Sequence, residues 1–139
     1  MVELRENQID VSTYLWLREQ VGWRKLSERQ AELAISNALY TICAYEDGEP
    51  VGMGRVVGDG AVICYVQDLV VIPKTQGKHI GGKILEKLKS YVENITEEGT
   101  TMMLSLMCAK GREPFYLKHD FVARPNENLG PGMIRFITK

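Results

Sequence analysis

One stretch of the chain combines residue types that could hold a phosphate group. It begins at Asp68 with an apolar run, turns at Pro73 and continues through the glycine-containing segment 76–82. Glycine lets a backbone approach a ligand closely. Free N–H groups at the start of a helix favour an anion, because the helix dipole adds to their partial positive charge. The order of residues therefore predicts a phosphate cradle between a strand and a helix.

Two common phosphate loops fit this stretch poorly. Gly77, Gly82 and Lys83 match most of the Walker A pattern, but Ile84 stands where that pattern needs a hydroxyl to hold Mg²⁺. The glycines also miss the G-x-G-x-x-G spacing, and no acidic residue follows about 20 residues on at the end of a second parallel strand. A nucleoside triphosphatase is therefore a minor alternative.

Helices and strands must position this cradle. Apolar residues from Ile80 to Ile95 recur at three- and four-residue spacing, which predicts an amphipathic helix directly after it. Another helix is expected from Asp10 to Gly22, and one more after Ser27, with Gln30 completing a capping box. Strands are expected over residues 2–4, 40–45, 51–57, 61–72, 102–108, 121–123 and 133–137, and a short helix over 113–118.

This order of elements predicts an α/β (α+β) fold with a mixed, mostly antiparallel central sheet and helices on both faces. The chain shows no repeat or linker, so a single domain over residues 1–139 is expected. Apolar residues make up 45% and charged residues 25%, which is globular composition. The net charge of −1 implies no broad attraction to nucleic acid or to a membrane. Without a spanning segment or a signal-like start, a cytoplasmic protein is the expectation.

The cysteines suggest neither a metal site nor a disulfide framework. Cys43, Cys64 and Cys108 each lie in a strand-like apolar stretch, which favours buried, reduced thiols. None has a partner at metal-ligand spacing, so no metal is expected. A catalytic pair of a cysteine with His79 or His119 is a minor alternative.

The cradle resembles the acetyl-CoA signature of the GNAT acetyltransferase superfamily, written Q/R-x-x-G-x-G/A. Gln76 fills its first position and Gly81 its last, while His79 stands where the family usually has glycine. The order of the expected elements is also that of the GNAT fold. Acetyl-CoA is then the implied cosubstrate. The residues implied to hold it are Leu69, Val70, Val71, Gln76, Gly77, Lys78, His79, Ile80, Gly81 and Gly82.

A second segment, Phe115–Phe121, looks like the F-Y-x-x-x-G-F motif of the same family. In the family the tyrosine commonly donates a proton to the departing CoA thiolate, and that role falls on Tyr116. His119 and Asp120 replace the usual hydrophobic residue and glycine. Ala109 stands where many members carry an asparagine that touches the cofactor.

The resemblance implies direct transfer of an acetyl group from acetyl-CoA to an amine of a small molecule or peptide. Some members place a catalytic glutamate where this chain has Tyr65. Asp68 is the candidate general base, although strand alternation would place it on the opposite face from Tyr65 and Gln67. A water relay, or an amine that is already neutral, stays open as an alternative.

The acceptor amine is only weakly indicated by the sequence. Trp16, Trp23, Arg24 and Lys25 lie near the expected connection of the first two helices, and residues 124–133 form another candidate rim. A homodimer is considered, because exposed sheet edges in this fold often meet a second copy. The alternative from another class is a non-catalytic acyl-CoA-binding sensor module with the same fold.

Overall fold

The computed structural model describes residues 1–139, which form two compact units, Met1–Leu106 and Met107–Lys139. The single domain expected over the whole chain stays a prediction. The elements of the first unit are β1 (Val2–Glu6), α1 (Val11–Gln20), α2 (Glu28–Ser36), β2 (Tyr40–Glu46), β3 (Glu49–Gly58), β4 (Ile63–Val71), the 3₁₀ turn η1 (Pro73–Thr75), α3 (Ile80–Ile95) and β5 (Met103–Ser105). The second unit contains α4 (Glu113–Leu117).

The first unit is built on one sheet with the strand order β1-β2-β3-β4-β5. The strands β1 to β4 pair with their neighbours in antiparallel fashion, and β5 pairs with β4 in parallel. A parallel pair needs a crossover, and α3 supplies it between β4 and β5. The expected mixed, mostly antiparallel sheet is therefore confirmed.

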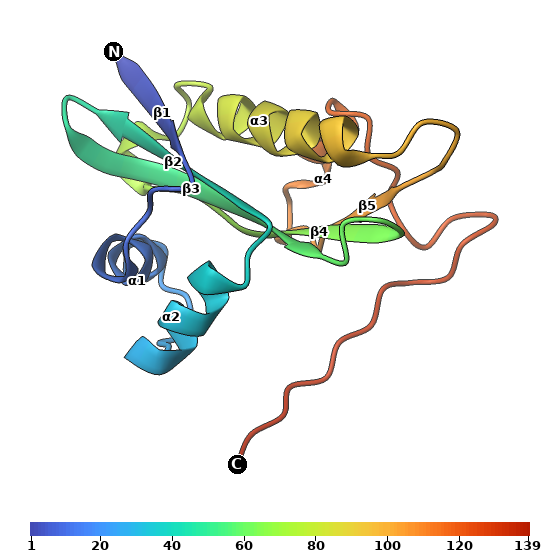
Figure 1. Cartoon of the computed structure of the whole chain (residues 1–139), viewed down its shortest axis with the longest axis horizontal. Coiled ribbons are helices and arrows are strands. Elements are labelled where there is room, and N and C mark those ends of the chain that lie inside the picture. Colours follow the sequence, from blue (N-terminus) through green and yellow to red (C-terminus); the bar gives the residue numbers. More distant parts are fainter. The chain divides into compact units, whose positions relative to one another are not determined.

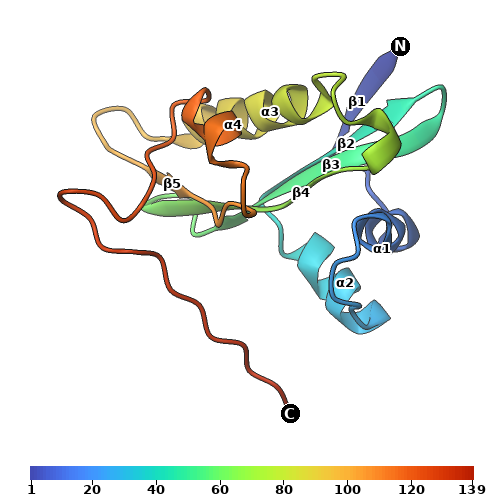
Figure 2. The same cartoon turned by 180° about the vertical axis from the view of Figure 1, so that it is seen from behind.

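Helices cover both faces of this sheet, as Figures 1 and 2 show. The long helix α3 packs on one face against β2, β3 and β4, and α1 packs on the other against β3 and β4, beside α2. The apolar stripe of α3 approaches β3 closely at Gly54. A Cβ atom on that glycine would lie 2.8 Å from both Ile84 Cγ2 and Leu88 Cδ1. Glycine there lets the helix and the sheet pack tightly.

A β-bulge interrupts the pairing of β3 and β4. Met53 lies opposite Val70 and Arg55 lies opposite Gln67, so Gly54 faces two residues of β4 instead of one. One of these two residues, Asp68, has a φ of 63°, in the left-handed region. Aspartate enters this region more readily than most non-glycine residues, because its short side chain can form local hydrogen bonds.

The bulge changes which side chains share a face of the sheet. The Gln67 side chain donates a hydrogen bond of 3.4 Å to the Asp68 carboxylate, so the two neighbours meet instead of pointing apart. The expectation that strand alternation would separate Asp68 from Gln67 is therefore wrong. Alternation holds only for regular extended backbone, and the left-handed residue breaks it.

The chain after the crossover helix is less regular than the sequence suggests. The strand expected over 102–108 is only Met103–Ser105, and residues 121–123 and 133–137 do not form strands. Apolar, β-prone residues form a strand only where a neighbouring strand supplies hydrogen-bond partners, and the second unit contains none. Cys108 lies beyond the shortened strand and is exposed, whereas Cys43 and Cys64 are buried as expected.

Candidate functional site

The bulge residue Asp68 lies at the centre of a buried ionic cluster. Its side chain is 0% exposed, and it accepts hydrogen bonds from the Tyr14 hydroxyl and from two guanidinium groups. The Arg18 Nη1 atom lies 2.5 Å from Asp68 Oδ1. The Arg55 Nε and Nη2 atoms lie 3.0 Å and 2.9 Å from Asp68 Oδ2. We call Tyr14, Arg18, Arg55 and Asp68 the Asp68 cluster.

The members of the Asp68 cluster come from α1 and from β3 and β4, the two strands on which α1 packs. Tyr14 and Arg18 are one helical turn apart on α1, so their side chains reach the sheet side by side. Arg55 belongs to β3, and its Nη1 also donates a 3.1 Å hydrogen bond to the carbonyl of Ala34 on α2. The cluster therefore fastens both N-terminal helices to the bulge.

Burial and a neighbouring charge affect the Tyr14 hydroxyl of this cluster. Burial, and then the neighbouring Asp68 carboxylate, raise the pKa of Tyr14 to about 12, so Tyr14 is a neutral donor at physiological pH. Two guanidinium groups, which stay protonated in proteins, face one carboxylate. The ionised cluster therefore carries a net charge of +1.

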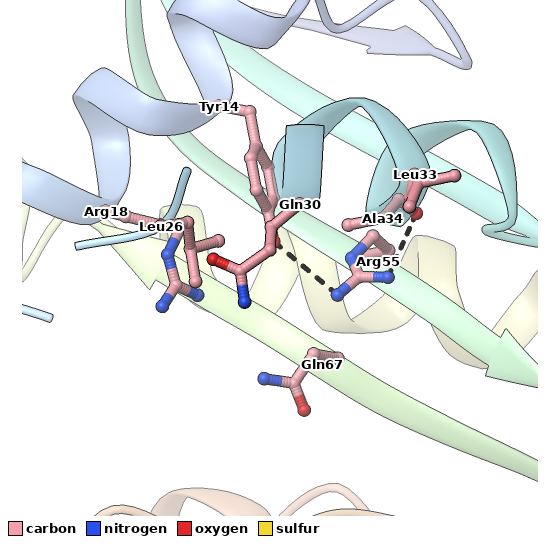
Figure 3. A pocket seen from close by; sticks show the side chains of 8 residues that line it. All are labelled: Tyr14, Arg18, Leu26, Gln30, Leu33, Ala34, Arg55 and Gln67. Carbon is pink, nitrogen blue, oxygen red and sulfur yellow. Dashed lines mark hydrogen bonds between the residues drawn. The ribbon is translucent and has the colours of Figure 1, made fainter. Parts of the chain in front are cut away.

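A pocket of about 470 Å³ opens beside the Asp68 cluster, between α1, α2 and the strands β3 and β4 (Figure 3). The pocket is lined partly by side chains with hydrogen-bond donors and partly by apolar side chains. The lining residues are Tyr14, Arg18, Leu26, Gln30, Leu33, Ala34, Arg55 and Gln67. Trp23, which the sequence places near the connection of the first two helices, lies beside the pocket residue Arg18, with its ring 5.2 Å from the guanidinium carbon.

The start of α3 differs from the starts of the two preceding helices. Asp10 and Ser27 cap α1 and α2 with their side chains, at 2.8 Å and 3.0 Å from the backbone nitrogens of Thr13 and Gln30. The residue before α3, His79, makes no capping bond, and no acidic residue lies in the first turn. The first N–H groups of α3 therefore have no acceptor from a capping side chain, as a phosphate cradle requires.

The backbone of the cradle is shaped by left-handed residues. Gly77 has a φ of 87° and His79 a φ of 63°. The position at which the GNAT signature usually has glycine thus takes the conformation that glycine adopts without strain, although a histidine occupies it. Gln76 ties this loop to the end of β4 with a 3.0 Å hydrogen bond to the Val71 carbonyl, and Lys78 pairs with Glu46 at 3.3 Å.

The strand β4 leaves part of one edge open within the first unit. Its parallel partner β5 pairs only with residues Ile63, Cys64 and Tyr65. From Val66 to Val71, β4 therefore has a strand neighbour only on the side of β3. The backbone of Leu69, Val70 and Val71 consequently includes groups on the open side that an extended ligand could pair with.

The remaining predicted residue, Tyr116, lies on α4 in the second unit. Its ring makes edge contacts with Phe115 and Phe121, at centroid distances of 5.0 Å and 5.9 Å. Burial raises the pKa of the Tyr116 hydroxyl, and the neighbouring Cys108 adds to the effect. Asp120, which replaces the glycine of the F-Y-x-x-x-G-F motif, has a φ of 72°. The turn that glycine usually makes is thus retained.

The sequence-predicted residues therefore divide between the two units. Asp68, the open edge and the cradle are continuous in the first, and Tyr116 belongs to the second. Sequence reasoning missed Tyr14, Arg18, Arg55 and Gln30. A usable signal was present, since Arg55 is the one charged residue of the expected strand 51–57 and needs a partner if it is buried.

Two further features concern metals and membranes. No group of three or more His, Cys, Asp or Glu side chains is placed to hold a metal ion. None of the four α-helices has the length and apolar character needed to cross a bilayer.

Comparison with known proteins gives one family. Residues 37–123 match the model of the acetyltransferase (GNAT) domain. The chain is 29% identical to a protein of unknown function, a probable acetyltransferase, from meticillin-resistant Staphylococcus aureus, with a TM-score of 0.86 over 99% of this chain and 100% of that one. No curated protein sequence matches the chain.

More distant structures share the fold. A GNAT-family acetyltransferase from Streptococcus pneumoniae is 24% identical, with a TM-score of 0.83 and complete coverage of both chains. Glucosamine-6-phosphate N-acetyltransferase from Arabidopsis thaliana is 14% identical, with a TM-score of 0.73 over 99% of each chain.

Proposed function

The chain belongs to the GNAT acetyltransferase family, and we propose that it transfers an acetyl group from acetyl-CoA directly to the amine of a small molecule or peptide. One observation supports acetyl-CoA as the cosubstrate. The open edge of β4 leads through a single short turn into the uncapped start of α3. An extended thioester arm and a diphosphate need these two features in this order.

Two segments of the first unit bind different parts of acetyl-CoA. Backbone groups of Leu69, Val70 and Val71 pair with the extended pantetheine arm as an added strand would. Backbone N–H groups of the segment Gln76–Gly82, which includes Gly77, Lys78, His79, Ile80 and Gly81, donate hydrogen bonds to the diphosphate. Lys78 adds positive charge at the rim, although it also pairs with Glu46.

Tyr116 is proposed as the acid of the reaction. The neutral amine nitrogen forms a bond to the acetyl carbon, the bond from that carbon to sulfur breaks, and the nitrogen releases one proton to water. The Tyr116 hydroxyl gives its proton to the departing thiolate. The raised pKa of Tyr116 keeps this proton in place at neutral pH. Solvent then returns a proton to the tyrosine.

The contacts of Asp68 favour a positioning role over that of a base. Its side chain is fully buried, and both of its oxygens already accept hydrogen bonds from the other members of the Asp68 cluster. Neither oxygen is therefore free to take a proton from an amine. We propose that Asp68 holds the bulge. The acceptor either arrives as a neutral amine or, as an ammonium group, first loses a proton to water.

The first test is calorimetric titration with acetyl-CoA, followed by a screen of amines that detects the free thiol of CoA. Saturable binding of acetyl-CoA and thiol release with an amine are expected. Binding of ATP with Mg²⁺ in place of acetyl-CoA would instead support the nucleoside triphosphatase. Acetyl-CoA binding with no turnover across the screen would support the acyl-CoA sensor.

Tyr116→Phe separates catalysis from binding. We expect kcat to fall by about 10²-fold or more, as for loss of a general acid, while the affinity for acetyl-CoA changes little. Tyr91→Phe is the matched control, because its ring stacks on Tyr40 in the first unit. A kcat equal to wild type in Tyr116→Phe across the pH range would refute the assignment of the acid.

A further inference from the structure

We propose that the pocket beside the Asp68 cluster binds an anionic group, a carboxylate or a phosphate, of the acceptor amine. This inference rests on the proposed function and specifies its substrate class. The structure places an open pocket of about 470 Å³ against buried guanidinium groups. That volume lies within the usual range of small-molecule sites.

Unbalanced charge is the first argument. Arg18 and Arg55 are only 12% and 13% exposed, and Asp68 is the one carboxylate that pairs with them. No aspartate or glutamate is among the residues that line the pocket. Burying a positive charge without a partner anion costs free energy, so an anionic ligand would stabilise the excess positive charge of the Asp68 cluster.

Unused hydrogen-bond donors are the second argument. The Nε atom of Arg18 is buried and has no acceptor. Its Nη1 and Nη2 atoms each donate one hydrogen bond within the chain, to Asp68 and to the Arg24 carbonyl, although each carries two hydrogens. Arg18 can therefore bind an anion without releasing Asp68.

Gln30 supplies a further donor. Its Oε1 atom accepts the 2.9 Å hydrogen bond from the Ser27 backbone in the capping box. The amide nitrogen is then left for the pocket, and Figure 3 shows this side chain extending between Arg18 and Arg55. Sites rich in donors and free of carboxylates suit carboxylate and phosphate oxygens.

The apolar wall of the pocket limits the size of the acceptor, and the positive Asp68 cluster limits its charge. Leu26, Leu33 and Ala34 make it apolar, so a short carbon chain can pack there. A second ammonium group would meet the net charge of +1 and be repelled. The same positive charge favours the neutral form of the attacking amine, which direct transfer requires.

The substrate test uses four amines of similar size: 4-aminobutanoate, O-phosphoethanolamine, butylamine and 1,4-diaminobutane. We expect kcat/KM for the better of the two anionic amines to exceed that for butylamine by about tenfold, the effect of one charge-assisted hydrogen bond, and the diamine to be poorest. The first two amines distinguish a carboxylate from a phosphate. Turnover of butylamine or the diamine at least as fast as both anionic amines would overturn the inference and leave the proposed function standing.

Gln30→Glu tests the site itself. Glutamate retains the capping box, so α2 keeps its start, but it introduces a negative charge into the pocket. We expect the preference for the anionic amine to fall about tenfold. Gln8→Glu, at an exposed position outside the pocket, should leave the preference unchanged. An unchanged preference in Gln30→Glu would refute the role of the pocket.

Failure of catalysis is distinguishable from failure of this inference. If no amine is acetylated, inorganic phosphate is titrated into the wild type and into Gln30→Glu. Saturable binding that Gln30→Glu loses supports an anion site even without turnover. Absence of phosphate binding to the wild type would then overturn the inference.

Discussion

Replacing Asp68 with asparagine removes the charge at the centre of the Asp68 cluster and changes almost nothing else. Asparagine has nearly the same shape, and it tolerates the left-handed backbone that the bulge requires at this position. The two guanidinium groups and the Tyr14 hydroxyl would then face a neutral amide. The variant therefore isolates electrostatics from backbone strain.

The expected loss of stability follows from burial. Asp68 is fully buried and its two arginine partners are almost so. Removing one partner of a buried ion pair typically costs about 3–5 kcal/mol, because the other charge is left uncompensated. We expect Asp68→Asn to lower the free energy of unfolding by about this amount, since one carboxylate serves two arginines.

Urea denaturation measures this loss. With a slope near 2 kcal/mol per molar of urea, the midpoint should fall by about 2 M while the slope stays constant. Asp47→Asn is the matched control, because Asp47 also has a positive φ, of 51°, but is exposed. The control should stay within about 0.5 kcal/mol of wild type. A similarly small change in Asp68→Asn would refute the view that the buried cluster depends on this charge.

Three further predictions concern stability. The pKa of Tyr14 is raised from 10.0 to about 12, so the protonated hydroxyl contributes fully to the free energy of unfolding below pH 10, and this contribution is lost as the pH rises towards 12. The urea midpoint should therefore fall less steeply between pH 10 and pH 12 in Tyr14→Phe than in wild type. Ser27→Ala removes the α2 cap and should cost about 1 kcal/mol in urea unfolding, whereas no loss would mean that α2 does not need its cap. Gly54→Ala places a methyl group against Ile84 and Leu88 and should lower thermal stability by about 1–3 kcal/mol; an unchanged melting temperature would show that α3 can shift.

Local signals explain why much of the fold could be predicted. The apolar period of α3 and the capping box of Ser27 and Gln30 depend on residues within one or two turns, and both are present in the structure. The strands β2, β3 and β4 likewise follow from local apolar runs and their turns. The expected C-terminal strands failed, because a strand needs a partner that local sequence does not reveal.

The Asp68 cluster could not be predicted in the same way. Tyr14 and Arg18 are 54 and 50 residues before the carboxylate that they contact, so the pairing depends on how α1 packs on the sheet. The bulge depends on the register of β3 against β4, which no single strand specifies. The positive φ of His79 was not predicted, because histidine itself does not require it.

The position of the bulge links the two halves of the proposed reaction. β4 pairs with β5 up to Tyr65, the bulge follows at Asp68, and the open edge continues to Val71. A bulge bends its strand and increases the local twist, so it can lead β4 away from a parallel neighbour. The carboxylate that stabilises the bulge also holds Arg18 and Arg55 at the pocket. One buried group thus supports both the edge proposed for the acetyl donor and the charge proposed for the acceptor. In this arrangement, substitutions at Asp68 affect both substrates, whereas Gln30→Glu affects the acceptor alone.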